Sequence, residues 1–237
     1  MNKLAIFVEG YTEIVFVEKL INEIAGYNNV LIECRKIRGG SSVPRKVVTF
    51  KGENQKTNAQ YFVLLVDCGG DDQVKTRIRE EHKNLTDKGY AAIIGIRDVR
   101  PTFTYHDVPK LELSLPKYIK TSLIPVKFIL SIMEIEAWFL SEASHFVRIN
   151  PNITVEKIKA VLGFDPENEN MEQRPTPAED LNNCYLIGGK IYNKQQPHDT
   201  IDALDYEFIY FTLSNNIKYM KKLIINIEAF LSSNKCD

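Results

Sequence analysis

No two cysteines of this 237-residue chain lie close together in sequence, so the C-x-x-C spacing of structural zinc sites and dithiol redox sites is missing. The four cysteines, Cys34, Cys68, Cys184 and Cys236, are spread singly along the chain. We therefore expect free thiols.

The chain also lacks a long hydrophobic run. No segment approaches the roughly 18–20 consecutive apolar residues that span a bilayer. The N-terminus lacks the apolar segment and cleavage site of a secretory signal peptide. We expect a cytoplasmic protein with no membrane partner.

An excess of charge of either sign is missing as well. The chain has 30 lysines and arginines against 31 aspartates and glutamates, a formal net charge of −1. Such a balance provides no overall attraction to nucleic acid or anionic lipid, so a polyanionic partner would need a local basic patch. The hydrophobic content of 44% is enough for a substantial core, in one large domain or in a core with a smaller appendage.

What the sequence does contain is an apolar run that ends in an acidic, glycine-containing turn. Residues 4–8 suit a strand that is buried on both faces of a parallel sheet. Glu9 follows this strand, Gly10 permits a tight turn, and Glu13 falls near the first turn of an expected helix. Ligands bind at the carboxyl edge of open α/β sheets, so both acids are candidate site residues. The alternatives are that Glu13 only offsets the helix dipole and that Glu9 is structural.

The same order of features occurs a second time. An apolar segment over residues 61–66 leads to Asp67, and Asp71 and Asp72 precede a second expected helix. If the two strands are parallel neighbours, Glu9 and Asp67 emerge at the same edge of the sheet. Crowded carboxylates repel one another unless cations lie between them, and hard oxygen ligands suit Mg²⁺ or Mn²⁺. The sequence therefore predicts a metal site in which Glu9 and Asp67 are the catalytic residues.

Later strands add further acids to this prediction. The strand expected over residues 91–96 leads to Asp98, which would join the cluster. Glu134 and Glu136 follow the strand expected over residues 125–131 and open a helix. Side chains two residues apart on a helix point in directions that differ by about 200°, so these two acids would not face one site. We prefer Glu136, which lies beside the only tryptophan. The predicted metal ligands are Glu9, Glu13, Asp67, Asp71, Asp98 and Glu136.

Basic residues are concentrated in two segments. Such clusters bind phosphate groups, and the glycines and serines within them can offer backbone N–H groups. The first segment spans residues 35–56, and the second is a glycine and lysine loop over residues 188–194 that lacks the Walker A pattern. The predicted phosphate contacts are Arg35, Lys36, Arg38, Arg45, Lys46, Lys190 and Lys194. The alternative is that these segments are solvated surface.

The C-terminal third changes to short helical segments. One helix is expected to start within residues 150–154 and to run to residue 162, another begins near residues 175–179, and residues 209–231 are amphipathic. We predict an α/β fold with a mainly parallel sheet flanked by helices in residues 1–145. A helical extension in residues 146–237 would pack on this core, unless the chain is one single domain.

These motifs together resemble a known fold. A strand that leads into Glu9-Gly10-x-Thr12-Glu13, followed by a strand that leads into Asp67-x-x-x-Asp71, is similar to the Toprim fold of primases, topoisomerases and OLD-family nucleases. The segment 134–140, the prolines at 175 and 177 and the lysine loop resemble the Toprim-related group called domain of unknown function 4276. This resemblance covers nearly the whole chain. It implies a compact Rossmann-like sheet with its site at the carboxyl edge.

The resemblance also assigns roles to residues. It implies that Glu9 is the Toprim glutamate, a general base or metal ligand, and that Glu13 is the second acid near the metal. Asp67 and Asp71 match the later acidic motif. The family spacing in that motif is D-x-D, whereas here three residues separate the two aspartates. The second position therefore stays open between Asp71, Asp72 and Asp98.

The sequence leads to two hypotheses from different classes. The first is a Mg²⁺- or Mn²⁺-dependent nuclease that hydrolyses DNA or RNA, in phage defence or in nucleic-acid repair. No tyrosine lies in a recognisable strand-passage motif, and 237 residues leave no room for the other modules of a topoisomerase or primase, so hydrolysis is favoured. The second is a non-catalytic Toprim-like subunit that works with a partner ATPase. The altered acidic spacing and the absence of an ATPase motif favour the second hypothesis.

Overall fold

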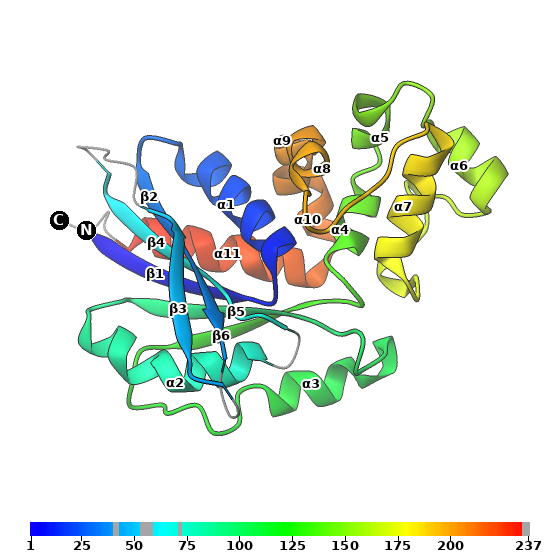
Figure 1. The fold of residues 1–237 in the computed structure, drawn as a ribbon. Coiled ribbons are helices and arrows are strands. Elements are labelled where there is room, and N and C mark those ends of the chain that lie inside the picture. The colour runs from blue at the N-terminus through cyan, green and yellow to red at the C-terminus, as the bar shows by residue number, and fades with distance from the viewer. Residues whose placement is uncertain (40–42, 53–58, 71–72, 234–237) are drawn as a thin grey trace. The chain divides into compact units, whose positions relative to one another are not determined.

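The computed structural model describes the chain except for residues 40–42, 53–58, 71–72 and 234–237 (Figure 1). A six-stranded sheet has the order β3-β2-β4-β1-β5-β6. β1 is parallel to β4 and β5, β2 is parallel to β4, and β3 is antiparallel to β2. The strands are β1 Asn2–Val8, β2 Val30–Arg38, β3 Lys46–Lys51, β4 Tyr61–Asp67, β5 Ala92–Asp98 and β6 Val126–Ser131. The expected α/β fold with a mainly parallel sheet is confirmed.

Helices α1 and α2 lie on opposite faces of the sheet (Figure 1). α1 contacts β2 and β4, and α2 contacts β1. The C-terminal end of α11 lies at the start of β4, where the Tyr61 hydroxyl donates to the Leu231 carbonyl. No helix in the described part of the chain is long and apolar enough to cross a membrane. The helices are α1 Tyr11–Ala25, α2 Gln73–Asp87, α3 Val108–Ser114, α4 Glu136–Ser141, α5 His145–Ile149, α6 Val155–Leu162, α7 Pro177–Ile187, α8 His198–Ala203, α9 Tyr206–Phe208, α10 Ser214–Asn216 and α11 Lys218–Ser232.

The two strands that lead to the predicted site lie in the core. β4 is buried along its whole length, and β1 is buried from Leu4 to Val8. Burial on both faces explains why the two strands are continuous apolar runs without polar alternation. On the α2 side, Phe7, Leu64 and Val66 belong to one hydrophobic cluster that includes Leu85 of the helix. This packing fixes the positions at which the two strands end.

The chain divides into two compact units. The first, which we call the sheet unit, comprises Met1–Arg97, Pro109–Ile129 and Ile225–Asp237. The second, which we call the helical unit, comprises Asp98–Val108 and Leu130–Ile224. Each unit is made of several separate segments of the chain, whereas the predicted division at residues 145/146 gave two continuous segments. That boundary stays a prediction.

The first basic segment contains a strand, β3, that was not expected from its sequence. Lys46–Lys51 forms β3, an edge strand paired with β2, and Arg35, Lys36 and Arg38 lie within β2 itself. The residues between the two lysines of β3 are Val-Val-Thr-Phe, which favour an extended backbone. Charged residues and glycines surround this short apolar run, and for that reason the segment was interpreted as a phosphate-binding loop and not as a strand. The described parts of this segment thus include regular sheet, with β3 exposed along its length.

The cysteine prediction is confirmed for the residues that the structure describes. Cys34, Cys68 and Cys184 are free and buried, whereas Cys236 lies outside the described residues. Burial is the first cause that raises the pKa of Cys34 to about 12 and of Cys184 to about 12. A thiol with such a pKa stays protonated at neutral pH and is a poor nucleophile.

Candidate functional site

The parallel pairing of β1 and β4 brings the two strongest candidate acids to one edge of the sheet. Val8 lies opposite Asp67 in the strand register, and Glu9 follows directly. The Glu9 carbonyl accepts hydrogen bonds from the N–H groups of Gly69 at 3.2 Å and Gly70 at 3.1 Å. The turn after β4 is therefore tied to the end of β1. The prediction that Glu9 and Asp67 emerge at the same edge is confirmed.

Gly69 is required at this turn for two reasons. Its φ of 82° lies in the left-handed region, where a side chain would be strained. A Cβ at this position would also collide with the Arg38 side chain. The turn therefore depends on a glycine that lets the Arg38 guanidinium approach the end of β4.

Asp67 is a buried carboxylate with two cationic partners. Its two oxygens accept hydrogen bonds from the two terminal nitrogens of Arg38, each at 3.2 Å, and Oδ1 also accepts the Gly69 N–H at 2.9 Å. Lys36 Nζ lies 3.5 Å from Oδ2. Burial raises the pKa of Asp67, and the charge and hydrogen bonds of Arg38 act in the opposite direction. The sequence predicts acids that need a metal as counterion, whereas in the structure Arg38 and Lys36 of β2 provide the positive charge beside Asp67.

Glu13 has a structural role in the described conformation. α1 begins at Tyr11, and the Glu13 Oε2 accepts a hydrogen bond from the Gly10 N–H at 3.1 Å. Such a contact satisfies one of the N–H groups that the first turn of a helix leaves without a partner. This capping contact differs from the alternative stated above, in which Glu13 only offsets the helix dipole, and that alternative stays a prediction. The role of Glu13 as a metal ligand also stays a prediction.

The donor chemistry at this edge fits a divalent metal, but the described residues do not complete a metal site. Glu9 and Asp67 supply the carboxylate oxygens that Mg²⁺ or Mn²⁺ takes. Asp71 and Asp72 lie outside the described residues. Among the residues that are described, no group of three or more His, Cys, Asp or Glu side chains is placed to hold a metal ion.

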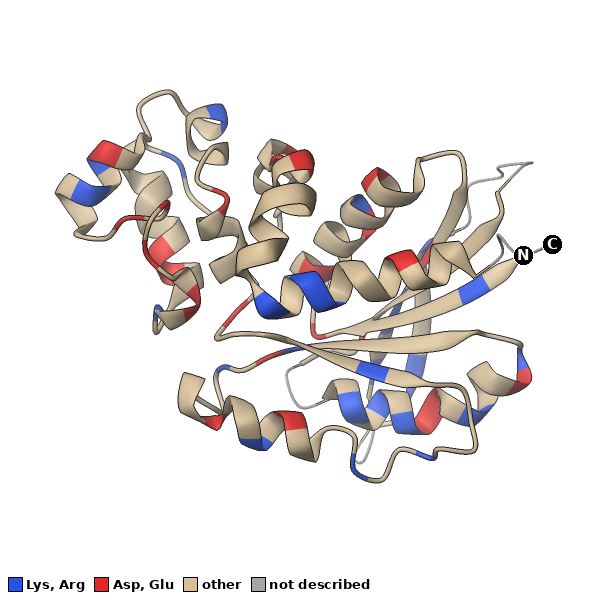
Figure 2. Cartoon of the chain, turned by 180° about the vertical axis from the view of Figure 1, so that it is seen from behind, with Lys and Arg blue, Asp and Glu red and all other residues tan. Residues whose placement is uncertain are grey.

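A groove of about 860 Å³ lies beside the Arg38 and Asp67 pair. Three of its lining residues are arginines, namely Arg38 from β2, Arg45 before β3 and Arg77 from α2. Glu80 also lines the groove and is paired with Arg45 at 3.3 Å and with Arg77 at 3.0 Å. Basic positions recur along α2 and on the neighbouring strands (Figure 2). Guanidinium groups in a groove of this kind suit a phosphate-bearing ligand.

The structure separates the predicted phosphate contacts of the first basic segment. Arg38 and Arg45 line the groove, and Lys36 joins them through its ion pair with Asp67. Arg35 is paired with Glu33 and lines a different cavity, and Lys46 lies on the exposed edge strand. Side chains of successive strand residues point to opposite faces, so β2 divides its basic residues between two surfaces.

The helical unit contains a second cluster of predicted site residues. Lys194 Nζ lies 3.1 Å from Glu134 Oε1 and 3.3 Å from Glu136 Oε2. The Tyr192 hydroxyl donates to Glu136 Oε1 at 2.7 Å. Burial lowers the pKa of Lys194, but Glu136, Glu134 and Asp98 raise it more, so the net pKa lies above its ordinary value. The ammonium is thus the built-in counterion of these acids.

The expectation that Glu134 and Glu136 would point apart is wrong. It assumed that both residues lie on one helix, but α4 begins only at Glu136. Met133 has a positive φ of 63°, which turns the chain before the helix and brings both carboxylates to Lys194. Lys190 does not join them and is exposed.

Two buried polar groups of the helical unit were not predicted. Tyr192 belongs to the Lys194 cluster through Glu136, and Glu172 accepts a hydrogen bond from Trp138 Nε1 at 3.4 Å. Burial raises the pKa of Glu172 to about 7. No local pattern marks either residue, because the contacts that bury them are long-range.

No family model, no curated protein and no solved structure matches this chain. The resemblance to the Toprim fold therefore stays a prediction.

Proposed function

We propose that this protein is a phosphodiester hydrolase, a nuclease that acts on DNA or RNA with the help of Mg²⁺ or Mn²⁺. The observation that supports the proposal is the placement of Glu9 and Asp67 at the ends of adjacent parallel strands, next to a groove lined by three arginines. Acidic groups that serve the reaction and basic groups that hold phosphate thus occur at one edge of one sheet.

The residues of the chain divide the work in this proposal. Arg38 and Arg45 would attract the phosphate backbone by their positive charge, which each shares with acidic partners, Asp67 for Arg38 and Glu80 with Glu81 for Arg45. Asp67 positions Arg38 through the two-pronged pair. Glu9 is the candidate general base, since it lies at the same edge and is buried. A bound divalent metal would neutralise the phosphodiester charge and lower the pKa of a bound water.

The test is cleavage of plasmid, single-stranded DNA and RNA with Mg²⁺ or Mn²⁺. Glu9→Gln and Asp67→Asn keep the size of each side chain and remove its charge, so both should reduce cleavage by at least about 100-fold, in the range of one lost general-base contribution. Asp87→Asn is the matched control, because Asp87 is exposed on α2 and pairs with Lys83 on the same helix. Equal cleavage by the wild type and both site variants would show that the protein is not this enzyme.

A second candidate function is a non-catalytic regulatory subunit that works with a partner ATPase. It is favoured by the pairing of both Asp67 oxygens with Arg38, an arrangement that already neutralises the acid without a metal. Calorimetric titration separates the two candidates. Binding of Mg²⁺ or Mn²⁺ that Asp67→Asn weakens favours the nuclease, whereas no binding at millimolar metal favours the regulatory subunit.

A further inference from the structure

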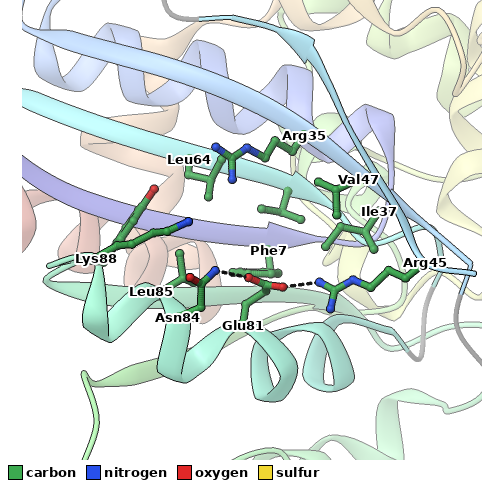
Figure 3. A pocket seen from close by; sticks show the side chains of 12 residues that line it. Phe7, Arg35, Ile37, Arg45, Val47, Leu64, Glu81, Asn84, Leu85 and Lys88 are labelled. Carbon is green, nitrogen blue, oxygen red and sulfur yellow. Dashed lines mark hydrogen bonds and ion pairs between the residues drawn. The ribbon is translucent and has the colours of Figure 1, made fainter.

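A second cavity lies within the sheet unit, on the face of the sheet that α2 covers. Its volume is about 300 Å³, at the lower end of the range of small-molecule sites. Figure 3 shows it between the strands and α2. The apolar lining comes from side chains that are almost fully buried, chiefly Phe7, Leu64, Val66 and Leu85. The cavity is therefore a continuation of the hydrophobic core that opens at one side.

One row of sheet residues that faces this cavity contains an arginine, although the other residues of the row are buried and apolar. The strand registers place Phe7, Val66 and Arg35 side by side in one row across the sheet. Two positions earlier in the same strand, Glu33 lies beside Leu64. Charged residues on a core-facing row are costly unless they reach water or a ligand. Their presence here indicates that this part of the face is built as a binding surface.

The polar rim of the cavity offers cationic donors that the protein itself does not use. The Nε of Arg35 donates a hydrogen bond to Glu33, and its two terminal nitrogens have no hydrogen-bond partner among the described residues. Lys88 likewise has no ion-pair partner for its ammonium in the described part of the chain. Arg45 differs, because Glu80 and Glu81 occupy both of its terminal nitrogens. Arg35 and Lys88 are thus the two groups that could receive an anion.

We propose that this cavity binds a small amphipathic anion, an aliphatic carboxylate of medium chain length. The apolar chain lies on Phe7, Leu64, Val66 and Leu85, and the carboxylate faces Arg35 and Lys88. The apolar lining excludes a bare phosphate as the preferred ligand, and the two cations disfavour a neutral one. The proposal does not rest on the proposed nuclease activity, because neither Glu9 nor Asp67 lines this cavity.

The experiment is calorimetric titration of the full chain with decanoate, and with decanol as the neutral comparator. Decanoate should bind at one site, and decanol should bind at least about tenfold more weakly, the loss expected for one charge-assisted contact. Methyl NMR of the same sample locates the ligand. The methyl signals of Leu64, Val66 and Leu85 should shift on addition of decanoate, whereas those of Leu181 in the helical unit should not.

Two matched pairs of variants test the two parts of the site. Val47 lines the cavity and is half exposed, so Val47→Trp should fill the opening and abolish binding. Val48→Trp places the same side chain one residue further along β3, on the other face of the strand, and should bind as the wild type does. Lys88→Ala should weaken binding about tenfold. Lys83→Ala removes a cation of α2 that does not line the cavity and should have no effect.

Several results would overturn the proposal. One is a wild-type protein that does not bind decanoate at millimolar concentration. Equal affinity in Val47→Trp and Val48→Trp would place the ligand elsewhere. Equal affinity for decanol and decanoate, or in Lys88→Ala and Lys83→Ala, would show that no anion is recognised. Lys88 and Lys83 are both exposed, so their alanine variants should fold. They therefore still test the proposal if a tryptophan variant does not fold.

Discussion

The sheet unit and the helical unit each bury a carboxylate against a partly exposed cation, but they build the pair in different ways. In the sheet unit, Arg38 reaches Asp67 from the adjacent strand. In the helical unit, Lys194 reaches Glu136 from a loop that is distant in sequence. The first pair is set by the register of two hydrogen-bonded strands, and the second by packing of a loop on a short helix.

The difference in cation matters for function. The planar guanidinium of Arg38 fixes both oxygens of Asp67, whereas the ammonium of Lys194 is a point charge shared by Glu134 and Glu136. The sheet unit therefore holds its acid in one orientation, as a reaction site requires. The helical unit neutralises its acids with a more adaptable contact, which suits a structural role.

The largest expected effect comes from removing the cation of the sheet unit. Arg38→Ala leaves the buried Asp67 with Lys36 alone and should lower the free energy of unfolding by about 2–3 kcal/mol, less than for a fully buried pair because Arg38 is half exposed. Urea unfolding followed by circular dichroism measures the change. The control is Arg35→Ala, the neighbour on β2 that pairs with Glu33. If the two variants lose equal stability, Asp67 does not depend on the guanidinium.

The next effect concerns Glu172, a buried carboxyl of the helical unit whose pKa burial raises to about 7 from 4.5. A raised acid pKa means that the folded state binds the proton more tightly, so the stability this group contributes is present below pH 4.5 and is lost as pH rises towards 7. Glu172→Gln removes this dependence. The variant should therefore gain about 2 kcal/mol on the wild type between pH 4.5 and pH 8, measured by urea unfolding. Glu167→Gln is the exposed control, and an identical pH dependence of the wild type and Glu172→Gln would contradict the prediction.

A smaller effect is expected for Lys194→Met. The raised pKa of Lys194 means that its ion pairs contribute fully below the ordinary lysine pKa of 10.5 and fade as pH rises above it. Because the ammonium is half exposed, the variant should be less stable than the wild type by under about 1 kcal/mol at pH 8. The gap should begin to narrow above pH 10.5 and should close only when the pH passes the raised pKa of Lys194 in the folded state. A gap that stays constant over this range would show that the lysine acts through packing alone.

The smallest effect concerns the salt dependence of nucleic-acid binding, which tests whether the basic residues of the groove or those of the smaller cavity contact phosphate. If the protein binds nucleic acid in the groove, Arg45→Ala should lower the slope of log affinity against log salt by about 0.7–0.9, the value for one phosphate contact. Arg35→Ala should leave the slope unchanged, because Arg35 is not among the residues that line the groove, whereas Arg45 lines both the groove and the smaller cavity. Fluorescence anisotropy with a labelled oligonucleotide at several salt concentrations measures both. A loss of slope in Arg35→Ala alone would place the nucleic acid at the smaller cavity that Arg35 lines and not in the groove.

Local patterns in the sequence predicted the elements that carry the sheet-unit site. The apolar runs before Glu9 and Asp67 gave two buried strands, and the rule that parallel strands end at one edge brought these acids together. A helix that ends at Leu162 was also predicted, and the structure has it over Val155–Leu162 with Thr154 as its N-cap. The strands and the helix depend on residues within a few positions of one another, so the sequence alone determines them. The meeting of Glu9 and Asp67 also required β1 and β4 to be neighbours, which the sheet order supplies.

The tertiary structure decided which partners those residues meet. No spacing in the sequence predicts that Arg38 will form a bidentate pair with Asp67, since their contact depends on β2 and β4 being neighbours. The meeting of Glu134 and Glu136 at Lys194 depends likewise on a turn at Met133 and on the packing of a loop distant in sequence. The charge balance of a buried acid is a long-range property, because burial and counterions come from segments that only folding brings together.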